Sequence, residues 1–404
     1  MTAIAEEITS TAPNTTTTAI SGVVDLDDGR GFLRTAGYCR SAGDIPISPA
    51  QVRQYGLRPG DHIEGTAGLR QAPDKPQPNK PQPNKAQSNK ARQAKAQQGQ
   101  TLLTVESVNG LTPAAAALRP NFDDLTPVYP NQRFRLEDGD QSSTARIIDL
   151  VSPIGKGQRG LIVAPPKAGK TTVLKTIAHA IAAAYPEVHL MLVLVGERPE
   201  EVTDLRRTVH GEVIAATFDQ SPGDHIKAAE LAIERAKRLA EIGLDVVVML
   251  DSLTRLGRAY NLAAPASSRT LTGGVAASAL QPPRKFLGAA RCLEEGGSLT
   301  ILSTALIDTG SQLDNVLFEE FKGTGNMELR LRRDLAEKRM FPAIDAVPSG
   351  TRHEELLMDP AEHAAVVSLR RALAALDSQH ALELLLGKTT APNAHFLRQV
   401  SAAQ

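Results

Sequence analysis

A phosphate-binding loop is the first feature of this 404-residue chain that could do chemistry. Residues 164–171 read Ala-Pro-Pro-Lys-Ala-Gly-Lys-Thr; they follow an apolar run that ends at Val163 and open into a stretch with helical spacing. In such a strand–loop–helix arrangement the backbone N–H groups and the positive end of the helix turn toward phosphate oxygens. We therefore expect Lys170 to reach the β- and γ-phosphates of a nucleotide and the Thr171 hydroxyl to join Mg²⁺. A plain turn would be the alternative, but the flanking strand and helix argue against it.

Two acids complete a candidate site for nucleotide hydrolysis. Asp251 ends the apolar run DVVVML, and Glu197 directly follows the run HLMLVLVG. At the carboxyl ends of neighbouring strands, Asp251 would reach Mg²⁺ through water and Glu197 would polarise the attacking water. A helix cap or a surface ion pair would explain either carboxylate alone. Two of them at adjacent strand ends beside a phosphate loop favour catalysis.

Two arginines are candidates for neutralising the charge of the transferred phosphoryl group. Arg352 lies in SGTRHEEL and Arg198 in GERPEE. A single arginine more often forms a surface pair. In ring-shaped ATPases, however, an arginine of this kind often comes from the next subunit, and it raises the rate by roughly 10³ to 10⁵.

The elements that must position these residues alternate between strand and helix patterns. The alternation predicts a parallel sheet covered by helices on both faces. The expected helices include 170–185 and 224–243, and the expected buried strands are 161–166, 189–196, 212–219, 245–251 and 298–306. A helical cap from about Pro360 is expected to bury apolar residues at helical spacing, namely Val366, Val367, Leu369, Leu373 and Leu376.

The amino-terminal part has another character. Residues 1–20 are rich in Thr and Ala without periodicity, which predicts a disordered tail. Short apolar runs cut by Gly and Asp then indicate a small all-β domain over 21–111. It carries a low-complexity insert, 71–99, with a lysine every five residues from Lys75 to Lys95. This insert is either a solvated spacer or a flexible basic arm that holds phosphates. A connector over 112–135, an ATPase domain over 136–359 and the cap over 360–404 complete the expected organisation.

The bulk composition excludes several classes of protein. Lys plus Arg and Asp plus Glu are both 45, so the chain as a whole has no charge bias toward nucleic acid or membrane. Cys39 and Cys292 are the only cysteines, which leaves no disulfide framework and no paired-cysteine metal site. The sequence shows neither a secretory leader nor a spanning apolar stretch, and we therefore expect a cytoplasmic protein without a membrane partner.

From about Thr144 to Leu357 the chain resembles the family of the bacterial transcription termination factor Rho. The blocks that carry the resemblance are VSPIGKGQRG, LIVAPPKAGKTT, ERPEEVTDLRR, LDSLTRLGRAYN, LTGGV, LIDTGS, EEFKGTGNMEL and EKRMFPAID. The resemblance implies an α/β RecA-like P-loop ATPase core in a homohexameric ring, with ATP and Mg²⁺ between subunits. It also implies an RNA-dependent, 5′-to-3′ translocase or helicase that binds nascent single-stranded RNA and releases it from the RNA polymerase elongation complex.

The same resemblance assigns roles to individual residues. Glu197 is the catalytic acid beside Lys170, Phe341 stacks on adenine, and Arg352 acts in trans. Further contacts to ATP fall on Lys156, Gly157, Gln158, Arg159, Gly160, Lys167, Ala168, Gly169, Thr171, Thr172 and Arg198, with Thr171 and Asp251 at the metal. Two channel loops would grip RNA, one with Arg269, Thr270, Leu271, Thr272, Gly273 and Gly274, the other over Asp308–Leu313 with Gln312.

The amino-terminal domain resembles the family's RNA-binding barrel, an all-β OB or cold-shock-like fold, in GRGFLRT and DIPISPAQVRQYGLRPGD. Phe32 and Arg34 are its candidate RNA contacts. The chain departs from the family where Arg30 and Pro46 replace aromatic surface, so the lysine insert is a candidate substitute for lost base stacking. Gln312 also replaces a basic residue, and Gly196 stands where the family usually has Asp.

Two other interpretations remain open from sequence. Catalytic subunits of rotary ATP synthases and their flagellar-export relatives share this core, although they lack the barrel with its basic insert. An RNA-binding regulator with weakened motor activity would account for Gln312 and Gly196, although the complete set of catalytic residues argues against it.

Overall fold

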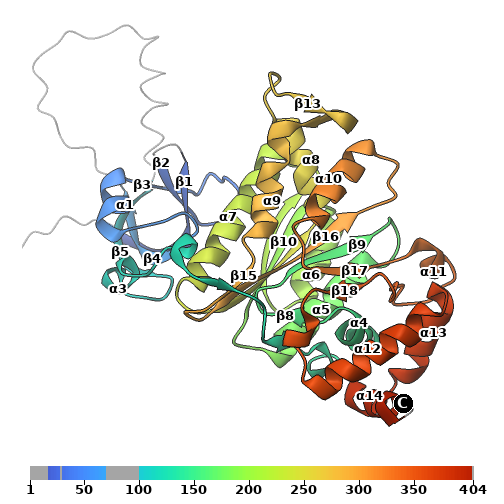
Figure 1. Ribbon diagram of the computed structural model, residues 1–404. Coiled ribbons are helices and arrows are strands. Elements are labelled where there is room, and N and C mark those ends of the chain that lie inside the picture. The colour runs from blue at the N-terminus through green and yellow to red at the C-terminus, as the bar shows by residue number, and fades with distance from the viewer. Residues whose placement is uncertain (1–16, 28–29, 70–99, 403–404) are drawn as a thin grey trace, which may run out of the picture. The chain divides into compact units, whose positions relative to one another are not determined.

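The computed structural model describes residues 17–27, 30–69 and 100–402, which form two compact units (Figure 1). The first unit comprises its described residues up to Ala36 and from Ser41 to Leu118. The second comprises Gly37–Arg40 and the described residues from Arg119 onward. The lysine insert 71–99 and residues 1–16 of the expected tail lie outside the described residues.

The first unit is a five-stranded antiparallel sheet, as expected for the barrel. Its order is β3-β2-β1-β4-β5. The strands are β1 (Thr17–Asp27), β2 (Arg30–Arg34), β3 (Ile45–Ile47), β4 (His62–Leu69) and β5 (Gln100–Val108), and the helices α1 (Pro49–Tyr55) and α3 (Pro113–Ala117). Alternate residues point inward, so that Val24, Leu33 and Ile63 are fully buried in one apolar cluster. Strand β1 begins at Thr17, inside the range expected to be a tail, because its first residues pair with the end of β4.

The second unit contains a sheet with all five of the strands expected from sequence. They are β9 (Arg159–Ala164), β10 (His189–Glu197), β11 (Glu212–Thr217), β12 (Asp245–Asp251) and β16 (Ser298–Leu306). Together with β17 (Met327–Arg330) they are parallel, in the order β11-β10-β12-β16-β9-β17. The short strands β18 (Gly350–Thr351) and β15 (Arg291–Leu293) add antiparallel pairs to β17 and β16.

Helices cover both faces of this sheet. The side chains of Leu192, Met249 and Ile162 belong to one buried cluster with residues of α4 (Ser143–Val151), α5 (Lys170–Ala184) and α6 (Pro199–Thr208). Helices α7 (Pro222–Ala240) and α8 (Leu253–Ala263) also pack on β10, β12 and β16. The doubly covered parallel sheet predicted from the alternating pattern is therefore confirmed, and it brings the strand ends with their polar residues to one edge.

The expected connector is partly structured. Within 112–135 lie α3, the 3₁₀ turn η1 (Phe122–Asp124) and the short strands β6 (Pro127–Val128) and β7 (Arg133–Phe134). Phe122 is buried, and Glu241 at the end of α7 accepts a hydrogen bond from its backbone N–H at 2.8 Å. The proline-rich composition therefore concealed two structured parts: α3 belongs to the first unit, and the residues from Arg119 onward belong to the second.

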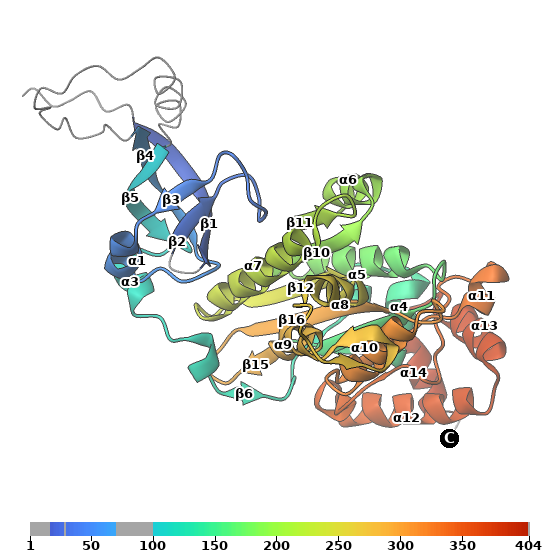
Figure 2. The ribbon, with the colours of Figure 1, turned by 90° about the horizontal axis from the view of Figure 1, so that it is seen from above.

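The chain ends in three helices, α12 (Pro360–Ala374), α13 (Ser378–Lys388) and α14 (Asn393–Ala402), which lie together beside α4 (Figures 1 and 2). Val366, Leu369 and Leu373 are buried as expected. The expectation for Leu376 is wrong: it follows the end of α12 and is 37% exposed.

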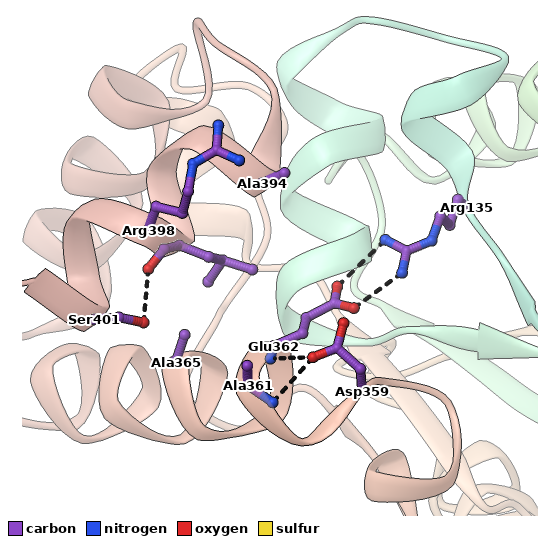
Figure 3. Close-up of a pocket in the computed structure, with 9 residues that line it drawn as sticks. Arg135, Asp359, Ala361, Glu362, Ala365, Ala394, Arg398 and Ser401 are labelled. Atoms are coloured by element: carbon purple, nitrogen blue, oxygen red, sulfur yellow. Dashed lines mark hydrogen bonds and ion pairs between the residues drawn. The ribbon is translucent and has the colours of Figure 1, made fainter.

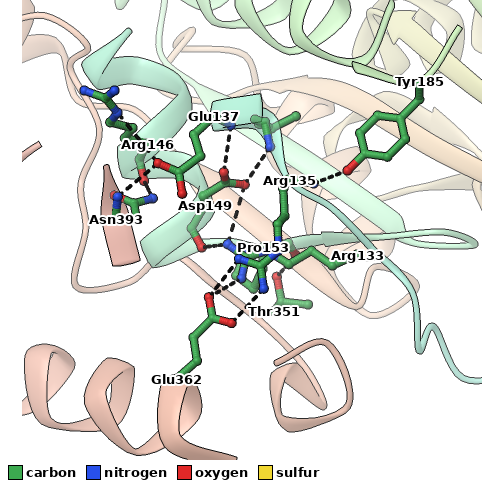
Figure 4. Close-up of polar contacts among 11 residues, drawn as sticks. Arg133, Arg135, Glu137, Arg146, Asp149, Pro153, Tyr185, Thr351, Glu362 and Asn393 are labelled. Carbon is green, nitrogen blue, oxygen red and sulfur yellow. Dashed lines mark hydrogen bonds and ion pairs between the residues drawn. The ribbon is translucent and has the colours of Figure 1, made fainter. Parts of the chain in front are cut away.

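Arginines join this cap to the rest of the unit (Figure 4). Arg133 donates to Glu362 of α12 at 2.8 Å and to the backbone carbonyl of Asp149 at 2.7 Å. Arg146 donates to the carbonyl of Thr389 at 2.9 Å. Beside these contacts, Arg135, Glu362, Ala365 and Arg398 line a cavity of about 270 Å³ (Figure 3). No helix among the described residues is both long enough and apolar enough to span a bilayer.

Candidate active site

Lys170, Glu197 and Asp251 meet at the carboxyl edge of the sheet. Lys170 begins α5, Glu197 ends β10 and Asp251 ends β12. The Lys170 Nζ lies 3.0 Å from Glu197 Oε1 and 2.5 Å from Asp251 Oδ1. Glu197 and Asp251 are 2% and 1% exposed. The three residues singled out from sequence thus form one buried charge cluster.

Burial and charge oppose each other at Lys170 and Glu197. Burial lowers the pKa of Lys170, but the two carboxylates outweigh burial and leave that pKa raised. Burial raises the pKa of Glu197, the negative charge of Asp251 raises it further, and Lys170 only partly offsets both. A carboxylate with a raised pKa next to a displaceable ammonium group is suited to accept a proton from water.

Two residues that the sequence analysis did not single out also contact these acids. Arg255, on α8, has its Nη2 3.3 Å from Glu197 Oε1. Thr304, on β16, donates its hydroxyl to Asp251 Oδ1 at 2.8 Å. Two signals were available in the sequence: Arg255 lies one helical turn after Asp251, and Thr304 lies in the strand expected beside it. Neither residue type is specific enough to identify a contact from such spacing.

The loop before α5 has the conformation that a phosphate-binding loop requires. Lys167 and Gly169 have positive φ values of 68° and 92°. Gly169 precedes the helix, and no side chain caps the first backbone N–H groups of α5, which therefore stay available to an anion. Phe341 is 50% exposed, and its ring lies 3.7 Å from where a Cβ on Gly169 would stand. The predicted adenine platform therefore does lie beside the loop.

The residues expected at the metal fit a hard divalent cation. Thr171 is half-buried at the start of α5. Asp251 ends β12, and its carboxylate is fixed by Thr304 of β16, the strand between β12 and β9. A hydroxyl and a carboxylate are oxygen ligands of the kind that Mg²⁺ shares with nucleotide phosphates. Asp251 contacts Lys170, and Thr171 is the next residue of α5.

The segment 156–160 lies at the opposite edge of the sheet. It leads into β9 and includes the first two residues of that strand, whereas the phosphate loop follows the strand. Lys156 Nζ lies 2.6 Å from Asp245 at the start of β12, and Gln158 is buried and donates to Asn326 Oδ1 at 2.7 Å. Residues 156–160 and 167–172 of one chain are therefore not brought together. The resemblance implies ATP sites between subunits, so an ATP contact of both blocks stays a prediction that one chain does not test.

Arg198 and Arg352 are both exposed but lie apart in the fold. Arg198 precedes α6, directly after Glu197, and its nearest carboxylate is Glu201 at 3.8 Å. Arg352 follows β18, and its backbone N–H donates to Asn326 at the same edge as segment 156–160. Arg198 can thus serve a phosphate bound at Lys170 of its own chain, whereas Arg352 cannot.

The two expected RNA-gripping loops lie side by side. Residues 270–276 form the small β13–β14 hairpin, which projects beyond α8 and α10 (Gln312–Lys322) in Figure 1. A Cβ on Gly273 would stand 3.1 Å from the carbonyl oxygen of Gln312. Asn261 holds the hairpin through Gly274 and Ala276, at 3.2 and 2.7 Å. Arg269, Thr270, Thr272, Gly274 and Gln312 are exposed.

The two residues of the first unit that were expected to contact RNA, Phe32 and Arg34, differ in how far their side chains are exposed to solvent. Phe32 is half-buried and is the only Phe, Tyr or Trp in the five strands. Arg34 is 4% exposed, and its guanidinium pairs with the carboxylates of Asp25 and Asp44. Its guanidinium carbon lies 5.3 Å from the centroid of the Phe32 ring. Arg34 therefore lies against Phe32 while its charge is taken up by two carboxylates, and the RNA contact expected of it stays a prediction.

Comparison with known proteins gives two family models that match. The nucleotide-binding domain of the ATP synthase alpha/beta family matches residues 144–351, and the RNA-binding domain of Rho termination factor matches residues 20–114. Among solved structures, a prototypical type III secretion ATPase is 27% identical over 62% of this chain and 71% of its own, with a TM-score of 0.55. The assembled ATPase EscN of enteropathogenic E. coli is 25% identical over 68% of this chain and 64% of its own, with a TM-score of 0.55.

Curated relatives carry the match over almost the entire chain. The transcription termination factor Rho of Streptosporangium roseum is 56% identical over 94% of this chain and 92% of its own length. The Rho proteins of Streptomyces lividans and Mycobacterium tuberculosis H37Rv are 55% and 54% identical over 94% and 95% of this chain. The chain spans only 51% and 61% of those two relatives.

Proposed function

Because this chain belongs to the family of the transcription termination factor Rho, we propose that it is an RNA-dependent ATP hydrolase that moves along nascent RNA in the 5′-to-3′ direction and releases it from RNA polymerase. The observation that carries the proposal is the cluster of Lys170, Glu197 and Asp251 at the phosphate loop. The family's RNA-binding domain at residues 20–114 supports RNA as the polymer on which it acts.

In this proposal, ATP with Mg²⁺ supplies the transferable phosphoryl group and the charge that screens it. Lys170 exchanges its two carboxylates for the β- and γ-phosphates, which it can do because it is a flexible point charge. Glu197, released from Lys170 and still facing Arg255 at 3.3 Å, orients the attacking water and accepts its proton. Thr171 and Asp251 hold the metal from the protein side.

The exposed loops connect hydrolysis to RNA. Helix α8 begins two residues after Asp251 and carries Asn261, which holds the β13–β14 hairpin. Arg258 of the same helix donates to Asp314 of α10 at 2.8 Å. A shift of α8 in response to the state of the nucleotide would therefore move both loops together. Because Gln312 carries no positive charge, the loop that contains it attracts RNA phosphates less strongly. The backbone and hydroxyl groups of the β13–β14 hairpin therefore contribute more of the RNA binding.

A ring of six copies completes each site in this proposal. Arg352 lies at the sheet edge opposite to Lys170. An arginine in that place serves the nucleotide of a neighbouring copy, where it neutralises the transition state. An isolated copy is therefore expected to hydrolyse ATP very slowly.

The alternative of a rotary ATP synthase subunit has one supporting observation, the family model over 144–351. The solved structures of similar fold are ATPases of type III secretion systems. The distinction is simple to make by experiment, because RNA would leave the ATP turnover of such a subunit unchanged.

Transcript release is the test of the proposal. Stalled elongation complexes with labelled RNA are incubated with the protein and ATP, or with a non-hydrolysable ATP analogue. We expect RNA in the supernatant only with ATP, and none with the Glu197→Gln variant. Two outcomes would contradict the proposed function. One is equal release with ATP and with the analogue; the other is no release combined with an ATP turnover that RNA does not change.

A further inference from the structure

Three arginines gather at the amino edge of the large sheet. Arg159 begins β9, Arg291 begins β15 and Arg352 follows β18. Asn326 ties two of them together: its side-chain oxygen accepts from the Arg159 backbone N–H at 2.8 Å, and its carbonyl accepts from the Arg352 backbone N–H at 2.9 Å. The Arg159 guanidinium donates to the carbonyl of Ala290, directly before Arg291, at 3.2 Å.

None of these guanidinium groups forms an ion pair with a carboxylate in the part of the chain that the structure describes. Arg159 donates to two backbone carbonyls, those of Thr324 and Ala290, at 3.1 and 3.2 Å. Arg291 lies over the ring of Phe122 with its guanidinium carbon 4.7 Å from the centroid. Burial lowers the pKa of Arg159, and the positive charges of Arg291 and Arg352 lower it further.

Gathered like charges of this kind are unfavourable unless an anion joins them, because buried or partly buried charges repel one another strongly. Arginine also presents a planar fork of donors that matches phosphate oxygens. The cluster therefore has the composition of a polyphosphate receptor.

The cluster cannot serve the phosphates bound at Lys170 of its own chain. Strand β9 separates Arg159 from Ala164, and five steps along a parallel strand cover roughly 17 Å. The phosphate loop begins only beyond that point. A nucleotide that meets this cluster must therefore be held by another copy.

We propose that Arg159, Arg291 and Arg352 form a single trans-acting receptor for the nucleotide phosphates held by the phosphate loop of a neighbouring copy. The inference rests on the proposed function and deepens it: Arg291 becomes a phosphate contact, and the ATP role expected for Arg159 moves to the adjacent subunit. Arg352 is the exposed member of the receptor, whereas Arg159 and Arg291 are half-buried.

Arg291 is the residue to change, because Arg159 also holds backbone carbonyls. Arg291→Met keeps an apolar stem over Phe122 and removes the charge; Arg291→Gln is a second variant, and Arg291→Lys restores the charge. Arg284→Gln is the matched control, since it removes an exposed arginine paired with Glu320 at 3.1 Å. ATP turnover at saturating RNA is expected to fall about tenfold for Met and Gln, because hydrogen bonds to charged groups are typically worth that much. Lys should retain most of the turnover and Arg284→Gln all of it.

Mixed rings test whether the receptor acts between copies. Arg291→Met is mixed with Lys170→Ala, and wild type mixed with Lys170→Ala gives the baseline for dilution by inactive copies. If the receptor acts in trans, some phosphate loops of the Met variant will face the intact arginine cluster of a Lys170→Ala copy. The turnover of the mixture with the Met variant, divided by that of the mixture with wild type, should then be severalfold higher than the turnover of the unmixed Met variant divided by that of unmixed wild type. An unchanged ratio would overturn the trans arrangement.

RNA backbone phosphate is the other possible source of the anion, and binding to labelled RNA separates the two. We expect the affinity for RNA to be the same for Arg291→Met and wild type. Weakened RNA binding with unchanged turnover would overturn the proposal. If Arg352→Gln abolishes ATP turnover while Arg291→Met and Arg291→Gln have wild-type turnover, this inference fails and the proposed function stands. If the wild-type protein does not hydrolyse ATP in the presence of RNA, the proposed function itself fails.

Discussion

Both units of the molecule bury a cation between two carboxylates, yet the two clusters serve different ends. In the second unit Lys170, the first residue of α5, lies between Glu197 and Asp251 at two strand ends. In the first unit Arg34 lies between Asp25 and Asp44. The Lys170 side chain is 15% exposed at a loop with unpaired backbone N–H groups, whereas that of Arg34 is 3% exposed within a sheet.

The difference is whether the cation can exchange its partners. Lys170 can leave its carboxylates for phosphate oxygens that arrive at the open end of α5. Arg34 has no such route, and its two partners stay with it as long as the unit is folded. The same arrangement of charges thus prepares a reaction in one place and fixes a strand in the other.

The largest effect is expected when the reactive cluster is neutralised. Glu197→Gln removes the proton acceptor and should lower ATP turnover by roughly 10²- to 10⁴-fold, the usual contribution of general base catalysis. Nucleotide binding should remain, because Lys170 and Thr171 are intact. Glu201→Gln, which changes an acid at 32% side-chain exposure, is the control and should keep full turnover. Equal turnover of the Glu197→Gln variant and wild type would remove Glu197 from the mechanism.

The second effect tests the fixed cluster. Arg34→Gln removes the cation with which Asp25 and Asp44 both pair, and breaking a buried pair by removing one partner typically lowers stability by about 3–5 kcal/mol. Urea unfolding followed by a probe in the first unit should show the loss, while RNA-independent ATP turnover stays unchanged. The exposed Arg53→Gln change in α1 should alter stability by less than about 0.5 kcal/mol. If Arg34→Gln lowered RNA affinity without lowering stability, Arg34 would be an RNA contact after all.

These two clusters also mark what the sequence could predict. The phosphate loop and both acids followed from motif and strand pattern, because each residue stands at a fixed place next to a strand end. The partners of Arg34 could not be predicted, since Asp25 and Asp44 approach it through strand register and a loop. The contact of Arg255 with Glu197 was missed for the same reason. The predicted direction of the strand over 161–166 already implies that 156–160 lies at its amino end and 167–172 at its carboxyl end, and therefore at opposite edges of the sheet.

Another buried carboxylate, Asp149, lies between these two cases. Asp149 accepts hydrogen bonds from the backbone N–H groups of Leu136 and Glu137, but its nearest cation, Arg133, is 3.6 Å away (Figure 4). Burial is the main cause that raises the pKa of Asp149 to about 6. The folded protein therefore holds this proton up to about pH 6, whereas the unfolded chain releases it near pH 4.

Stability from this group is accordingly present at low pH and is lost as pH rises through about 6. A shift of about two pH units corresponds to about 3 kcal/mol. We expect the unfolding free energy of wild type, relative to Asp149→Asn, to decrease by up to that amount between pH 4 and pH 7. Urea unfolding across this range measures it, with the exposed Asp138→Asn variant as control. A difference that does not change with pH would show that Asp149 is already ionised in the folded state.

The smallest expected effect concerns Phe32, which the fixed cluster holds in place. Phe32→Ala should weaken binding of labelled single-stranded RNA by about 1–3 kcal/mol, the usual value of one base stacked on an aromatic ring. Phe32→Tyr keeps the ring and should bind as wild type does. Equal affinity of the Ala and Tyr variants would mean that bases do not stack on this face.

The direction of β9 has a consequence for how copies can associate. With the phosphate loop at one end of this strand and the arginine cluster at the other, every copy offers a donor face and an acceptor face that differ. A symmetric two-fold dimer would set like faces together and leave each loop unserved. In the proposed arrangement, head-to-tail contacts bring each phosphate loop to the arginine cluster of the next copy, and a closed ring leaves no loop or cluster without a partner.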